Sequence, residues 1–105
     1  MDAKTLVALR GSIRKWQAIV NKTGEDQGPY NCPLCLLFNS PEHPSRRSTM
    51  CRGCPVFDYS GDIGCHNTPY ETWDECDQDD SEGLAKAAQA ELDFLISLLP
   101  EGELP

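Results

Sequence analysis

Two Cys-x-x-Cys pairs, separated by residues 36–50, constrain this chain of 105 residues more than any other feature. The first pair is Cys32-Pro-Leu-Cys35, the second is Cys51-Arg-Gly-Cys54, and Cys65-His66 follows. Two short pairs at this separation are typical of a tetrahedral thiolate site, and zinc is the ion that such sites usually hold. The sequence therefore predicts one zinc ion in the middle of the chain.

More than four potential ligands surround this predicted ion, so two ligand sets remain open. The simplest set takes all four cysteines of the two pairs, namely Cys32, Cys35, Cys51 and Cys54. In the alternative set Cys65 replaces Cys51. We favour the first set because both pairs then have the short spacing of a zinc knuckle. His66 is expected beside the site or at the surface.

The redox state of the cysteines depends on the compartment. Charged residues at positions 10, 14 and 15 interrupt the first apolar stretch, so no signal-peptide pattern is present. No segment approaches the ~20 apolar residues of a membrane span. We therefore expect a cytoplasmic protein with reduced, metal-bound cysteines, with disulfides or an iron–sulfur cluster as the alternatives.

Apolar residues recur at alternating spacings of three and four in two stretches, which is one face of a helix. The first stretch predicts a helix over residues 3–21 and the second a helix over residues 82–99. Their apolar positions are Leu6, Leu9, Ile13, Trp16 and Val20 in the first and Ala85, Ala88, Leu92, Leu95 and Leu99 in the second. The matched stripes predict a mainly α fold in one domain, residues 1–105, with these two long helices packed together. The zinc module, residues 30–73, is inserted between them.

Other local signals define the ends and the inserted module. Asn21–Gly24 predicts a helix stop with Gly24 in the left-handed conformation, and the off-stripe cations, Lys15 among them, are expected in solvent. Residues 25–29 are expected to form a linker, and residues 36–38 to pack beneath the metal. A short strand is expected at Val56, Phe57 and Tyr59.

Thr68-Pro69-Tyr70-Glu71 predicts a capping box and a short third helix. Asp80 or Ser81 is expected to cap the last helix, and Pro100 to end it. A second apolar line on that helix, consisting of Ala87, Phe94 and Leu98, exceeds what one partner helix needs. These additional apolar side chains have three possible partners: the zinc module, a second copy in a homodimer, or a target protein.

Charge is divided unevenly along the chain, whose net charge is −8. Residues 1–22 carry five cations against Asp2, which gives +4, while residues 58–105 carry thirteen acids against Lys86, which gives −12. The acids expected to bind a partner protein are Asp74, Glu75, Asp77, Asp79 and Asp80. The alternative is a nucleic-acid-binding module that uses Arg46, Arg47 and Arg52.

Catalysis is not indicated by the motifs present. No His-x-Glu precedes a Cys-x-x-Cys, and neither a phosphate-binding Gly-Lys loop nor a nucleophile elbow occurs. A site made only of thiolates is normally closed to substrate. We therefore expect a non-enzymatic protein, in which Cys76 has no assigned role.

Residues 32–73 resemble a group of small cysteine-rich proteins encoded by bacteriophages and prophages. The resemblance rests on Cys32-Pro-Leu-Cys35, Cys51-Arg-Gly-Cys54-Pro55 and Cys65-x-x-Thr68-Pro69-Tyr70-x-x-Trp73. It implies a phage-encoded protein that acts in the cytoplasm of the host cell. Because that group brings no established activity, the resemblance implies only that the protein binds a host or phage protein, as an inhibitor or anti-defence protein would.

Overall fold

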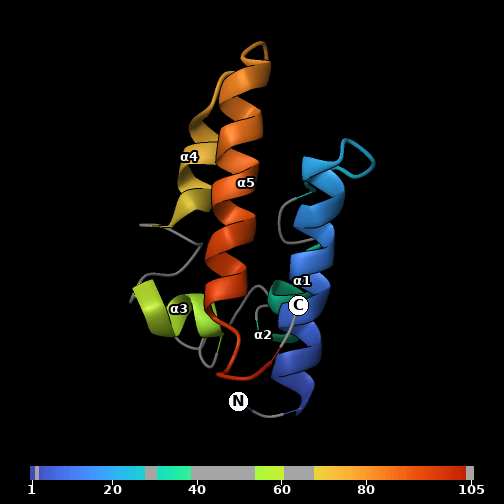
Figure 1. Ribbon diagram of the computed structural model, residues 1–105, viewed down its shortest axis with the longest axis vertical. Helices are drawn as coiled ribbons and strands as arrows, with labels where there is room; N and C mark the ends of the chain where they lie inside the picture. The colour runs from blue at the N-terminus through green and yellow to red at the C-terminus, as the bar shows by residue number, and fades with distance from the viewer. Residues whose placement is uncertain (2, 28–30, 39–53, 61–67, 104–105) are drawn as a thin grey trace, which may run out of the picture.

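The computed structural model describes residues 1, 3–27, 31–38, 54–60 and 68–103, and helices dominate these ranges (Figure 1). The helices are α1 (Ala3–Val20), α2 (Pro33–Phe38), α3 (Pro55–Ser60), α4 (Pro69–Glu75) and α5 (Ser81–Ser97). The long helices α1 and α5 pack against each other, α4 packs on α5, and α2 packs on α1. The predicted mainly α fold with two long packed helices is confirmed. Within the described ranges, no helix combines the length and the apolar character needed to cross a membrane.

The core lies where α1 meets α5. Leu9, Ile13 and Trp16 of α1 are buried there together with Leu92 and Leu95 of α5. The ends of the predicted stripes differ, because Leu6 and Val20 are only half-buried and Ala85 is exposed. An apolar repeat of 3.5 residues drifts by about 20° per two turns around a straight helix of 3.6 residues per turn. The centre of each stripe therefore faces the core, while its ends rotate away.

Helix α2 approaches α1 closely at Gly11. A Cβ atom at position 11 would lie 3.0 Å from Cγ and 3.2 Å from Cβ of Pro33, so the glycine makes room for the proline ring. Leu34 of α2 is consequently buried, whereas Leu36 and Leu37 are exposed. The expectation that Leu36 and Leu37 pack inward is therefore wrong, since a helix this short can present only one face to α1.

The strand expected at residues 56–59 is also wrong, since these residues belong to helix α3. A strand needs a neighbouring strand for its backbone hydrogen bonds, whereas a helix supplies them internally. The proline that opens α3 already has the backbone angle of a first helical turn. Val56 is buried, and Tyr59 contacts Phe94 of α5 edge-on, with ring centroids 5.1 Å apart.

Helix α4 begins at Pro69, as predicted, but without the Thr68 side-chain hydrogen bond that the predicted capping box requires. The side chain of Thr68 makes no capping hydrogen bond, although its carbonyl oxygen accepts a hydrogen bond from the backbone N–H of Glu71 at 3.0 Å. The predicted cap of α5 is confirmed, because Oδ1 of Asp80 accepts a hydrogen bond from the backbone N–H of Gly83 at 2.9 Å.

The end of α1 is a Schellman motif with lysine at the left-handed position. The backbone N–H of Thr23 donates to the carbonyl of Ala18 at 2.8 Å, and that of Lys22 donates to the carbonyl of Ile19 at 3.0 Å. Lys22 has φ 62°, so the left-handed residue is Lys22. The prediction that Gly24 takes this position is wrong. Gly24 is needed for a different reason, since a Cβ there would lie 2.8 Å from Cβ of Ala18.

Lys22→Gly is expected to raise the free energy of unfolding by about 0.5–1 kcal/mol, because glycine adopts the left-handed conformation without the cost that a side chain adds. Gly24→Ala is expected to lower it by about 1–3 kcal/mol through the clash with Ala18. Urea unfolding of both variants measures the two effects. A loss of stability in Lys22→Gly would contradict this account of the helix end.

Candidate functional site

The structure describes the side chains of two predicted zinc ligands, Cys32 and Cys54. Cys54, directly before α3, belongs to the apolar core, and the half-buried Cys32, directly before α2, packs against that core. Among the described side chains, no three potential ligands converge on one point. Other residues of the predicted site lie outside the described residues or have no described side chain: Cys35, Cys51, Cys65 and His66. The zinc site therefore stays a prediction.

A buried ion pair between Lys15 and Asp26 connects α1 to the segment that follows it, and Asp26 in turn contacts α4. Asp26 accepts a hydrogen bond from Nζ of Lys15 at 2.7 Å, from the hydroxyl of Tyr70 at 3.0 Å and from Nε1 of Trp73 at 3.2 Å. The side chains of Lys15 and Asp26 are 9% and 11% exposed. The expectation of a solvated Lys15 is therefore wrong. Residues 25–27 have neither helix nor strand, as expected of a linker, and residues 28 and 29 lie outside the described residues. The residues that surround this charge pair come from different segments of the chain, so local sequence patterns do not reveal that the pair is buried.

Aromatic contacts reinforce this junction between α1 and α4. The ring of Trp16 meets Tyr70 edge-on at a centroid distance of 6.0 Å and Trp73 at 5.2 Å, and Nζ of Lys15 lies 5.5 Å from the Trp16 ring centre. Edge-on aromatic pairs are favourable because the positive edge of one ring faces the negative face of the other. The Tyr and Trp of the Thr-Pro-Tyr-x-x-Trp motif thus hold α4 against α1.

Glu91 is a buried acid on the core face of α5, and only 4% of it is exposed. Burial raises the pKa of Glu91 from the ordinary value of 4.5 to about 7; the charge of Cys32 adds to this shift, Lys15 opposes it and Asp26 adds to it again. Glu91 therefore interacts electrostatically with Cys32, Lys15 and Asp26. Glu91 was not predicted to be buried, although its position between Ala88 and Leu95 continues the apolar stripe.

Glu91→Gln is expected to become increasingly stabilising as pH rises. The folded-state pKa lies above the unfolded one, so the stability contributed by the protonated acid is complete below pH 4.5 and is lost as pH rises through about 7. Between about pH 5 and about pH 8, the stability of Glu91→Gln relative to the wild type should increase by about 2–3 kcal/mol. Urea unfolding at both pH values measures this difference.

Glu82→Gln provides the control on the same helix. Glu82 is 81% exposed, and its ion pair with Lys86, at 3.4 Å, is also in solvent. Exposed pairs of this kind contribute about 0–1 kcal/mol, so this variant should follow the wild type across the pH range. Equal pH profiles for Glu91→Gln and the wild type would contradict the raised pKa of Glu91.

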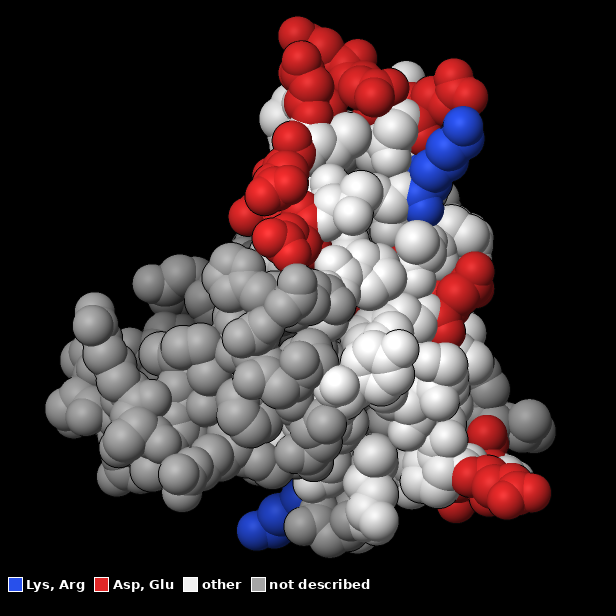
Figure 2. Space-filling view, turned by 90° about the vertical axis from the view of Figure 1, so that its left-hand side faces the viewer, with Lys and Arg blue, Asp and Glu red and all other residues white. Residues whose placement is uncertain are grey.

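Five exposed acids lie at the end of α4 and in the turn that leads to α5, here called the acidic turn: Asp74, Glu75, Asp77, Asp79 and Asp80. Oδ1 of Asp77 accepts a hydrogen bond from the backbone N–H of Asp79 at 3.0 Å, and Asp80 caps α5. Figure 2 shows acidic side chains gathered at this end of the molecule and continuing along one side of it.

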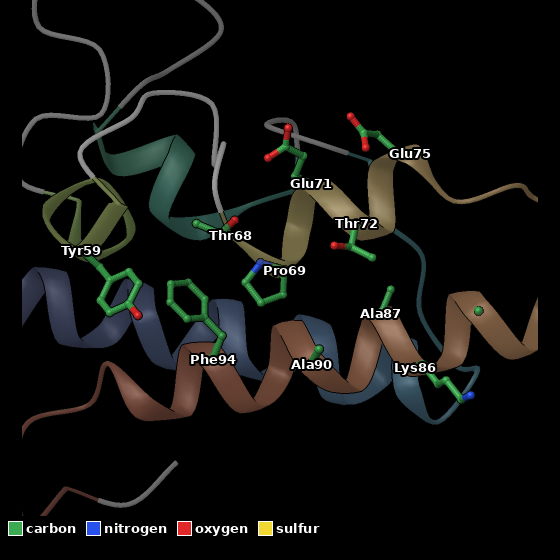
Figure 3. A pocket seen from close by; sticks show the side chains of 11 residues that line it. Tyr59, Thr68, Pro69, Glu71, Thr72, Glu75, Lys86, Ala87, Ala90 and Phe94 are labelled. Carbon is green, nitrogen blue, oxygen red and sulfur yellow. The ribbon is translucent and has the colours of Figure 1, made fainter.

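A groove runs from the acidic turn between α4 and α5, here called the α4–α5 groove (Figure 3). It has a volume of about 970 Å³. Pro69, Ala87 and Ala90 lie along its floor, and Tyr59 and Phe94 face each other at one end. Glu71 and Glu75 project from α4 along its edge. The groove therefore combines an apolar floor with two acids on α4 and one cation, Lys86, on α5.

The second apolar line of the last helix is largely covered within the protein itself. Ala87 is buried where α4 packs on α5, and Tyr59 of α3 covers part of Phe94. Of the three expected occupants of this surplus, residues of the inserted module are the ones that the structure places there. The α4–α5 groove is the part of this face that stays open to a partner.

Arg46, Arg47 and Arg52, the basis of the nucleic-acid alternative, lie outside the described residues. Cys76 is half-buried at the end of α4, where a Cβ at Gly83 would lie 3.1 Å from its sulfur.

Comparison with protein-family models, with curated proteins and with solved structures found no match to this chain.

Proposed function

We propose that this protein is a small, non-enzymatic zinc-binding protein that binds a basic segment of another protein through the acidic turn and the α4–α5 groove. The observation that carries the proposal is the position of five exposed acids beside a groove with an apolar floor. Acids alone would attract any cation, whereas an adjoining apolar groove adds contact area that favours a particular side-chain pattern.

Long-range electrostatics favour a basic partner. Residues 58–105 carry −12, and their only cation, Lys86, lies next to Glu82 in an exposed ion pair. A negative surface speeds the encounter with a positively charged partner and repels nucleic acid. Basic side chains would therefore meet the acidic turn, and the apolar side chains of the same segment would enter the α4–α5 groove.

The resemblance to phage-encoded cysteine-rich proteins supports a host or phage protein as the partner. In this proposal the protein acts in the bacterial cytoplasm and inhibits or redirects that partner. Zinc has a structural role, because the region between the cysteine pairs contains few apolar side chains. Structural zinc contributes about 10–16 kcal/mol in small sites, which is enough to decide whether such a region folds.

Replacing all five acids of the acidic turn by their amides is expected to weaken partner binding at least about tenfold at low salt. Asparagine still caps a helix, so the replacement at Asp80 removes charge while the hydrogen bond to Gly83 can persist. The measurement is a pull-down from bacterial lysate, followed by titration of the captured protein at two salt concentrations.

The matched control removes two acids elsewhere, Asp93→Asn and Glu101→Gln, both of which are exposed. This control should bind like the wild type. Unchanged affinity of the amide variant at low salt would overturn the proposal. Retention of a labelled oligonucleotide instead of a protein would favour the nucleic-acid alternative.

A further inference from the structure

A second groove lies between α1 and α2, on surfaces that the acidic turn does not share. It is called here the α1–α2 groove, and Figure 1 places α2 beside the N-terminal half of α1. Val7, Leu36 and Leu37 line it and are 69%, 51% and 42% exposed. Three large aliphatic side chains are thus exposed together in one concave surface.

This exposure is unusual for a chain with so little apolar material. Hydrophobic residues make up 39% of the sequence. Each buried large aliphatic side chain would contribute roughly 1.5–3 kcal/mol to folding, and here three of them forgo much of that gain. Clustered rather than scattered exposed apolar residues are typical of an interaction site.

The charge around the α1–α2 groove has the opposite sign to that of the rest of the chain. Of the cations on α1, Lys15 binds Asp26 and Arg10 binds Glu103. Lys4 and Arg14 line the groove, and neither forms an ion pair within the described part of the chain. Among the described residues that line the groove, none is an acid. The groove therefore presents an apolar centre between two available positive charges.

We propose that the α1–α2 groove docks an acidic segment of a partner protein that carries apolar side chains at helical spacing. The apolar side chains of that segment contact Val7, Leu36 and Leu37, and its carboxylates pair with Lys4 and Arg14. This surface is separate from the acidic turn, so the protein has two docking sites of opposite charge and can bridge two partners.

Other occupants fit the charges less well. A second copy related by a two-fold axis would bring Lys4 and Arg14 of both copies together without an acid from either groove. An anionic membrane or a nucleic acid is an extended negative surface, so the net charge of −8 on the whole protein repels it. A short peptide instead responds mainly to charges within the Debye length, about 8–10 Å at ordinary salt.

The test uses fluorescence anisotropy with a short labelled helical peptide that has Leu at positions i, i+3, i+4 and i+7 and Glu elsewhere. A second peptide has Gln in place of Glu, so it carries no charge that the acidic turn would attract. The wild-type protein should bind the Leu/Glu peptide at least about tenfold more tightly than the Leu/Gln peptide, and added salt should weaken the binding. Arg14→Glu and Val7→Ser should each reduce the affinity at least about fivefold.

Lys22→Glu is the matched control, because it makes the same change of charge at the other end of α1, outside the groove. It should bind the Leu/Glu peptide like the wild type. Both substituted groove side chains are exposed, so circular dichroism should show folded variants. Equal affinity for both peptides, or unchanged affinity in Arg14→Glu and Val7→Ser, would overturn the proposal. If the protein bound phosphatidylglycerol vesicles or associated with itself, and Val7→Ser abolished this, the proposal would also be overturned. The occupant of the groove would then be a membrane or a second copy of the protein.

Discussion

Asp26→Asn is expected to lower the free energy of unfolding by about 3–5 kcal/mol, because it leaves the buried ammonium group of Lys15 without its counter-ion. The carboxylate of Asp26 accepts hydrogen bonds from Lys15, Tyr70 and Trp73, so one substitution weakens the link between α1 and α4 in three places. Urea unfolding measures the loss, and the near-ultraviolet circular dichroism of Trp16 and Trp73 reports whether the aromatic contacts persist.

Two further variants separate this ion pair from general damage. Glu25→Gln changes the exposed neighbouring acid and should alter stability by less than about 0.5 kcal/mol. Combining Lys15→Met with Asp26→Leu removes both charges, so it should recover part of the loss. If Asp26→Asn were as stable as the wild type, or if the double variant were less stable than Asp26→Asn, the ion pair would not be what holds α1 and α4 together.

Removal of the proposed zinc ion is expected to have the largest effect, since structural zinc contributes about 10–16 kcal/mol in small sites. Chelator should therefore unfold residues 30–73, with a loss of helical signal in circular dichroism. Elemental analysis with thiol titration should find one zinc ion, four cysteines protected by metal and two reactive thiols, from the six cysteines present. A metal-free protein that keeps its fold in chelator would contradict the zinc site.

Serine substitutions distinguish the ligands from the other cysteines. Cys54→Ser should lose the ion, whereas Cys76→Ser should retain it, because Cys76 lies at the end of α4 and belongs to neither predicted ligand set. Cys51→Ser and Cys65→Ser decide between the two sets, since only one of these variants should lose zinc. Retention of zinc by Cys54→Ser would exclude both sets.

Several local features followed from sequence alone. The long helices end within two residues of the predicted bounds, and Asp80 caps α5 as its position before the helix indicates. These features depend on residues close together in the chain, where helical periodicity and a capping hydrogen bond involve only one or two turns. The same reasoning located the acidic turn, because neighbouring acids stay neighbours in any fold.

Features that depend on distant contacts did not follow. The stretch at residues 56–59 has strand-forming side chains, yet it forms a helix that proline opens, and the described part of the chain contains no strand that could pair with it. Leu36 and Leu37 are apolar but exposed, because Gly11 brings Pro33 and Leu34 against α1. Their exposure created the α1–α2 groove, which no sequence pattern indicated.

The sequence by itself determined where the long helices run, how their central faces pack and which end of the molecule is acidic. Only the tertiary structure decided which charged residues are buried, since Lys15, Asp26 and Glu91 all look like surface residues in the chain. The physical reason is that removing a charge from water is costly unless a distant segment supplies a counter-ion or burial shifts its pKa. Both conditions depend on which segments meet in space, and the order of residues along one helix does not contain that information.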